Sequence, residues 1–291
     1  MINKKNISTK CKSLLSQWKE NLNLTNYERS KFEDILNQLD CQIKKLEKKE
    51  LQVSVYGRVG VGKSSLLNAL IEKKIFPTDI INGNTKTLKS YKWCKRFKSL
   101  NNVELIDFPG IDDISNSNKE EINFHYLLDT DLILFVIDSD IKRIDFNSIK
   151  ELLKHNKPIL IVLNRCDQWN EREVKLILSS IHKKLSFYKD KIKIALVASS
   201  PREARIKTDG TVRSKQKDPK VDIFKSELKD IIDQSGELLL CINSLRIADK
   251  FYKLLKENRL LKKKKAAQSL IGKYAALKAS GVAINPFLMI D

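Results

Sequence analysis

The chain has 291 residues, and 42% of them are hydrophobic, which is enough for one buried α/β domain and a smaller helical part. Its net charge of +19 favours anionic partners such as phosphates, nucleic acid or an acidic membrane, with a solvated lysine-rich surface as the alternative. The five cysteines form no C-x-x-C pair, which excludes a zinc ribbon and indicates reduced thiols in the cytoplasm. Residues 1–12 are polar and lysine-rich, unlike a cleavable signal peptide.

The apolar pattern divides the chain into three predicted parts. Residues 1–50 are expected to be helical, because apolar residues recur there at alternating spacings of four and three. Residues 51–233 alternate β-rich runs with amphipathic stretches, which predicts an α/β domain with a largely parallel sheet. The runs expected to be strands are Leu51–Tyr56, Thr87–Trp93, Val103–Phe108, Leu132–Asp138, Pro158–Leu163 and Ile192–Val197.

Two segments depart from this alternation. Within 201–219, the pair Asp209-Gly210 separates two short runs and predicts a basic β-hairpin insertion, with a disordered loop as the alternative. Residues 234–291 are the third part, with a long helix or a helix pair expected over 236–279 and a short apolar tail after it. Between Lys250 and Lys278 there are ten Lys or Arg residues and one acidic residue, so contact with acidic lipid head groups is one hypothesis.

A phosphate-binding loop is predicted at residues 57–64, with the sequence GRVGVGKS. It fits G-x-x-x-x-G-K-[ST] and lies between a β-rich run and a helical pattern, which is the context that this motif requires. Lys63 would place its charge on the β- and γ-phosphates, and the Ser64 hydroxyl would bind Mg²⁺. The residues expected to contact the nucleotide here are Gly57, Gly60, Val61, Gly62, Lys63, Ser64 and Ser65.

The sequence Asn164-Arg165-Cys166-Asp167 selects the base. It follows an apolar run and fits the [NT]-K-x-D pattern of GTP-binding proteins, with Arg165 in place of Lys. The Asp167 carboxylate would accept two hydrogen bonds from guanine, a pair of donors that adenine lacks on that edge. The stem of Arg165 can still cover a base, so the substitution is expected to be tolerated.

Asp107-Phe108-Pro109-Gly110 fits the D-x-x-G motif. Asp107 would hold Mg²⁺ through water, and the Gly110 N–H would contact the γ-phosphate and report hydrolysis. The threonine that completes the Mg²⁺ shell is expected to be Thr85, which precedes Lys86, with Thr87 and Thr78 as alternatives.

Ala198-Ser199 follows the last run and resembles the loop that places a backbone N–H on guanine O6. These motifs occur in order over about 150 residues, and the domain resembles the G domain of bacterial Era-like P-loop GTPases of the TRAFAC class.

A closer resemblance is to a cyanobacterial family of GTP-binding proteins with a C-terminal apolar domain of unknown function. The matching stretches are Gly57–Leu70, Asn82–Trp93 and Val282–Asp291. In that family the last stretch begins a membrane-associated hairpin, so the resemblance implies a truncated chain here, as a shortened relative or an incomplete reading frame.

The residue after D-x-x-G bears on catalysis. Many small GTPases place Gln there to orient the attacking water, whereas this chain has Ile111, which predicts slow intrinsic hydrolysis. Lys63, Thr85 and Gly110 are the residues expected to act in that step. Three functions stay open: a regulatory GTPase peripheral to a membrane, an RNA- or ribosome-associated GTPase, and a non-hydrolysing GTP-dependent interaction module. The oligomeric state cannot be inferred.

Overall fold

The molecule is built on a six-stranded sheet flanked by helices. A computed structural model describes residues 7–78, 88–111, 117–206 and 212–284. The strand order is β2-β3-β1-β4-β5-β6, and every neighbouring pair is parallel except β2 with β3. The strands are β1 Glu50–Tyr56, β2 Lys89–Lys92, β3 Asn102–Asp107, β4 Leu132–Ile137, β5 Ile159–Leu163 and β6 Ile192–Leu196. The expected α/β fold with a largely parallel sheet is confirmed, and each strand overlaps one of the expected runs.

Both faces of the sheet are covered, which explains why β4 is apolar at every position. Leu132, Leu134 and Val136 pack on the face that carries α4 (Lys63–Ile71) and the start of α8 (Asp222–Ile284). Ile133, Phe135 and Ile137 pack on the opposite face. The helices on that second face are α5 Ser117–Asp129, α6 Arg143–Lys154 and α7 Glu171–Lys184.

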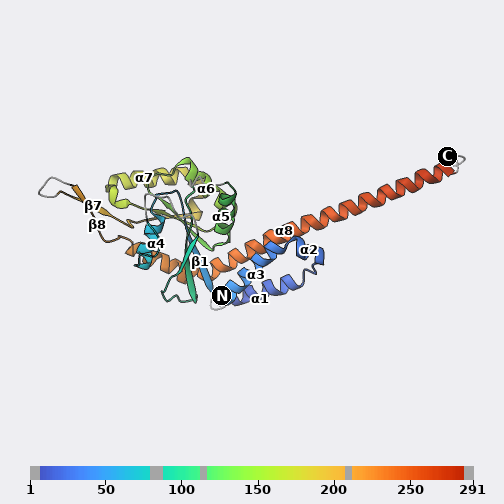
Figure 1. Cartoon of the computed structure of the whole chain (residues 1–291), viewed down its shortest axis with the longest axis horizontal. Helices are drawn as coiled ribbons and strands as arrows, with labels where there is room; N and C mark the ends of the chain where they lie inside the picture. The colour runs from blue at the N-terminus through green and yellow to red at the C-terminus, as the bar shows by residue number, and fades with distance from the viewer. Residues whose placement is uncertain (1–6, 79–87, 112–116, 207–211, 285–291) are drawn as a thin grey trace.

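Three helices precede the sheet, as expected for residues 1–50: α1 Ile7–Glu20, α2 Asn26–Lys31 and α3 Glu33–Lys48. They lie along α8 (Figure 1). The fully buried ring of Phe251 in α8 meets Trp18 and Phe32 edge-on, at centroid distances of 6.2 and 5.9 Å. The Arg259 guanidinium in α8 binds Glu28 and lowers the pKa of that carboxyl to about 2.

The long C-terminal helix α8 is a single helix rather than a pair, and it begins at Asp222 instead of near residue 236. Gly236 lies inside it, where an added Cβ would stand 2.6 Å from Leu100 Cδ1, so this glycine permits close packing and does not end the helix. The boundary expected at residue 234 therefore falls within continuous helix. Figure 1 shows α8 extending well beyond the rest of the protein. In the described part of the chain, no helix combines the length and apolarity needed to cross a bilayer.

The expected hairpin is present as two antiparallel strands, β7 Arg202–Ile206 and β8 Val212–Gln216. Asp209-Gly210 lies outside the described residues, so its turn type stays a prediction. At the base of the hairpin, the Lys220 backbone exchanges hydrogen bonds of 2.8 and 3.2 Å with Ala198. Short 3₁₀ helices of the described chain lie at Cys166–Gln168 and Ser186–Lys191.

A buried polar junction joins α8 to the C-terminal end of α5, and we call it the α5–α8 junction. The Asn243 amide donates to Asp129 O at 2.8 Å and to Asp131 Oδ1 at 2.7 Å. Lys157 donates to Leu128 O at 2.9 Å and to Asn243 Oδ1 at 3.0 Å. Donors at a helix C-terminus bind carbonyls that have no partner within the helix, so these contacts satisfy the end of α5.

The α5–α8 junction is closed to solvent. Lys157 is 3% exposed, and burial lowers the pKa of its ammonium group well below the usual range. The Arg246 guanidinium donates to the same Leu128 carbonyl, and Lys45 of α3 pairs with Asp131 at 2.9 Å. A buried network of this kind is stable only when its members are all paired, so α3, α5 and α8 are held in one arrangement.

We predict that Phe251→Ala lowers the free energy of unfolding by about 3–5 kcal/mol, because it leaves a cavity where α8 meets the N-terminal helices. Tyr252→Ala is the matched control, since the neighbouring Tyr252 side chain is 49% exposed. It should change stability by about 0.5 kcal/mol or less. Urea denaturation followed by circular dichroism measures both, and equal losses in the two variants would contradict the packing described.

Candidate functional site

The phosphate-binding loop connects β1 to α4 at the carboxyl edge of the sheet. Gly62 precedes α4 with φ of 92°, and a Cβ there would stand 2.3 Å from Asn164 Nδ2, so glycine is required for both conformation and space. Lys63 begins the helix, is 7% exposed, and donates from Nζ to Gly57 O at 3.0 Å and to Arg58 O at 2.8 Å. The loop thus wraps around its own ammonium group beside a helix N-terminus, a geometry suited to anions.

Ser64 and Asp107 meet as expected. Ser64 Oγ donates to Asp107 Oδ2 at 2.6 Å, although the two residues come from α4 and β3. Asp107 is fully buried; burial raises the pKa of its carboxyl, while the Ser64 hydroxyl and the Lys63 ammonium oppose that rise. Its other oxygen, Oδ1, is buried without a hydrogen-bond partner among the described residues. A hydroxyl beside a carboxylate with an unpaired oxygen fits the preference of Mg²⁺ for oxygen ligands.

The D-x-x-G segment touches the phosphate-binding loop. An added Cβ on Gly110 would stand 2.7 Å from the Val59 backbone nitrogen, so only glycine allows this approach. Ile111 N donates to Gly57 O at 3.2 Å. The Ile111 side chain packs partly buried against the apolar cluster on the α5 and α6 face. The loop that would sense the γ-phosphate is therefore fixed on both sides, by the phosphate-binding loop and by the core.

Asn164 holds the base-recognition loops to the phosphate-binding loop. Its side chain is 1% exposed, donates to Val61 O at 2.9 Å and accepts from Ser199 N at 3.0 Å. One carboxamide therefore connects three loops that are far apart in the sequence. Ala198 and Ser199 are both buried at this position.

Arg165 and Asp167 lie directly after β5, in the predicted base-recognition motif. Arg165 has φ of 60°, an uncommon left-handed conformation that turns the chain sharply after β5. Its guanidinium donates to Gly60 O, so its stem crosses from the base loop to the phosphate-binding loop. Asp167 lies in the short 3₁₀ helix with its carboxylate exposed, which leaves it accessible to guanine.

The threonine prediction has no structural outcome for its first choice, because Thr85 and Thr87 lie outside the described residues. Thr78 is described and is exposed in the loop after Phe76. Ser65 lies in the first turn of α4, half-buried, next to Ser64.

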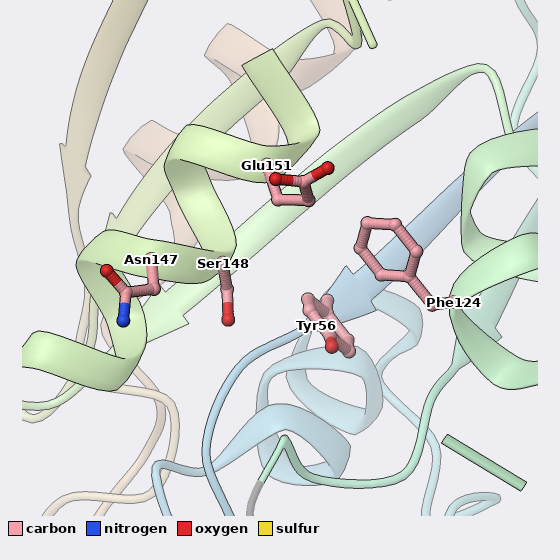
Figure 2. A pocket seen from close by; sticks show the side chains of 5 residues that line it. All are labelled: Tyr56, Phe124, Asn147, Ser148 and Glu151. Carbon is pink, nitrogen blue, oxygen red and sulfur yellow. The ribbon is translucent and has the colours of Figure 1, made fainter. Parts of the chain in front are cut away.

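Three charged residues of this region were not found from the sequence: Arg58, Asp138 and Asp145. Arg58 is 8% exposed and pairs with both carboxylates. A usable signal existed, since Asp138 directly follows an apolar strand at the edge where ligands bind. A shallow pocket lies on the α5 and α6 face of the sheet, between the end of β1, α5 and α6 (Figure 2). It is lined by Tyr56, Phe124, Asn147, Ser148 and Glu151.

The chain is similar to known GTP-binding proteins. A family model described as "50S ribosome-binding GTPase" matches residues 52–165. The probable GTP-binding protein EngB of Mycoplasmopsis agalactiae is 32% identical over 133 residues, which cover 42% of this chain and 65% of EngB. The tRNA modification GTPase MnmE of Helicobacter pylori is 32% identical over 154 residues, 51% of this chain and 32% of MnmE. The chain thus spans about a third of the length of MnmE.

Solved structures also align with this chain. Aquifex aeolicus Era bound to GDP and AlF₄⁻ covers 52% of this chain and 52% of its own, with 26% identity and a TM-score of 0.46. A bacterial dynamin of an oligomerised pair covers 100% of this chain and 62% of its own, with 15% identity and a TM-score of 0.49.

Proposed function

We propose that this chain, which contains a GTP-binding G domain of the TRAFAC class related to EngB and MnmE, is a regulatory GTPase. It hydrolyses GTP slowly with Mg²⁺ and passes its nucleotide state to a helical region that contacts an acidic membrane surface. The observation that carries this proposal is the α5–α8 junction. It attaches the long helix α8 to the C-terminal end of the helix that follows the D-x-x-G loop.

In this proposal the residues of the site divide the work. The phosphate-binding loop and Lys63 hold the phosphates, while Asp167 recognises guanine through its exposed carboxylate. Ser64 and Asp107 hold Mg²⁺, which would neutralise the charge that develops on the phosphates. The Oδ1 atom of Asp107, which is buried and has no hydrogen-bond partner in the described part of the chain, supports that role. Thr85 supplies the second hydroxyl in the GTP-bound state.

The path from nucleotide to helix is short. Gly110 lies against Val59 of the phosphate-binding loop, and α5 begins a few residues later. The far end of α5 presents the carbonyls of Leu128 and Asp129 to α8. Any shift of α5 that accompanies loss of the γ-phosphate must therefore move α8 or break buried hydrogen bonds, and breaking them is costly.

The distal part of α8 is the proposed membrane-facing region. Every residue from Leu260 to Ala275 is exposed, including Leu270 at 67% and Ile271 at 69%. Lys262–Lys265 are four consecutive lysines that precede Leu270 and Ile271 in α8. Lysines beside exposed apolar groups are the combination that anionic head groups attract.

A second candidate function is an RNA- or ribosome-associated GTPase. Its supporting observation is the basic hairpin β7–β8, whose base is bonded to the predicted guanine loop through Ala198 and Lys220. The names of the matching family and of MnmE refer to ribosomes and tRNA. A two-stranded ribbon of basic character is one of the shapes that nucleic acids accommodate.

The nucleotide claim predicts that the wild type binds GTP in preference to ATP in titration calorimetry. Asp167→Asn should weaken GTP binding by about 10- to 100-fold, because a charged acceptor of two hydrogen bonds is lost. The same variant should gain affinity for XTP, since the Asn amide can donate to the carbonyl that xanthine carries in place of the guanine amino group. Gln168→Ala is the control, and equal wild-type affinities for GTP and ATP would refute the claim.

Hydrolysis is the second prediction. Because Ile111 offers no side-chain hydrogen bond to a water, the isolated wild-type protein should hydrolyse GTP at a rate on the order of 10⁻³ s⁻¹ or below under single-turnover conditions. Asp107→Asn should remove even this rate, which would assign it to the site. A wild-type rate near that of an activated GTPase would contradict the prediction. GTP binding without any turnover would favour a non-hydrolysing interaction module.

Membrane contact is tested by flotation with vesicles of anionic or neutral phospholipid. The wild type should float with the anionic vesicles, and changing Lys263 and Lys264 to Gln should weaken binding about tenfold or more. Changing Lys150 and Lys154 of α6 to Gln removes the same charge elsewhere and should have little effect. No flotation, together with a salt-dependent shift of structured RNA, would favour the second candidate.

A further inference from the structure

Asp138 lies between the two halves of the nucleotide site. It directly follows β4, whose neighbours in the sheet are β1 and β5. The loop after β1 is the phosphate-binding loop, and the loop after β5 carries the Asn164–Asp167 motif. The Asp138 side chain is 22% exposed, so it is accessible to both loops but largely shielded from water.

On the phosphate side, Asp138 pairs with Arg58. The Arg58 Nη2 atom donates to Asp138 Oδ1 at 2.9 Å, and its Nε lies 3.1 Å from both oxygens of Asp145. Asp145 is fully buried and also accepts from Lys142 N at 3.0 Å, at the start of α6. Arg58 is thereby fixed by two carboxylates, and with it the backbone carbonyl that receives the Lys63 ammonium.

On the guanine side, Asp138 faces Arg165. The Arg165 Nη1 atom lies 3.5 Å from Asp138 Oδ2, while its Nη2 donates to Gly60 O. The side chain of Arg165 is 42% exposed. The left-handed backbone of Arg165 brings its side chain beside Asp138. The Asp138 carboxylate then orients the Arg165 guanidinium.

We propose that Asp138 is a positioning residue that couples the two halves of the nucleotide site, by holding Arg58 of the phosphate-binding loop and Arg165 of the guanine motif on one carboxylate. The two arginines and the two aspartates balance in charge. Without Asp138, two guanidinium groups would lie near each other, and among the described residues Asp145 would be the carboxylate left paired with Arg58. Arg165 would keep its hydrogen bond to Gly60 O but lose the carboxylate beside its Nη1 atom, so the stem proposed to cover the base would be held less firmly. This inference rests on the proposed nucleotide binding and deepens it.

The test is a double-mutant cycle on GDP affinity with Asp138→Ala, Arg165→Ala and the double variant. If Asp138 acts through Arg165, each single change should weaken GDP binding about tenfold, and the double variant should be weakened about tenfold as well. Independent contributions would instead multiply to about a hundredfold. A residue that only stabilised the fold would lower the Tm of the free protein without producing this non-additivity.

Two further variants sharpen the cycle. Arg165→Lys keeps a cation, so its GDP affinity should remain sensitive to Asp138→Ala. Asp138→Asn keeps the oxygen that accepts from Arg58 while removing the charge, and serves if Asp138→Ala fails to fold; it should weaken GDP binding in the same non-additive way. Asp140→Ala is the matched control, because Asp140 is on the same loop but pairs with Lys184 and Ser180.

The outcomes separate the two claims. Multiplicative losses, or an Asp138→Ala affinity equal to that of Asp140→Ala, would overturn the coupling and leave the proposed function in place. A wild-type protein that does not bind GDP would overturn both. Non-additive losses confined to the Asp138 and Arg165 variants would establish the coupling.

Discussion

Parallel pairing of the central strands is the constraint on which the site depends. Because β1, β3, β4, β5 and β6 run in one direction, their carboxyl ends meet at one edge of the sheet. That geometry brings together Gly57, Asp107, Asp138, Asn164 and Ala198, which are scattered over more than a hundred residues of sequence. The side chains then connect the loops directly, and the Asn164 carboxamide makes the clearest of these links.

Most of the fold and much of the site followed from sequence patterns, and the physical reasons are local. A strand buried on both faces is apolar throughout, which makes β4 visible in the sequence. The phosphate-binding loop is visible because its G-x-x-x-x-G-K-S pattern lies between a β-rich run and a helical pattern. The sequence pattern places the start of α8 near residue 236 instead of at Asp222, because a glycine such as Gly236 usually weakens a helix. Here the glycine makes room for Leu100, a contact that only the tertiary structure reveals.

The buried charges were the other part that sequence patterns missed. Lysine is usually found on the surface, yet Lys157 is buried among carbonyls at the α5–α8 junction. Arg58 is likewise buried, against one carboxylate from the loop after β4 and one from α6. Burial of a charge depends on partners that the chain supplies from a distance, so no local pattern announces it. Both exceptions lie where one part of the molecule must hold another in place.

A small rotation at the α5–α8 junction would be amplified along the length of α8. About forty residues of α8 continue beyond Asn243, and at 1.5 Å per residue they reach roughly 60 Å. A tilt of about 10° at the junction would carry the far end of a rigid helix of that length through roughly 10 Å. A change of a fraction of an ångström beside a phosphate would in this way become a displacement as large as the diameter of a helix.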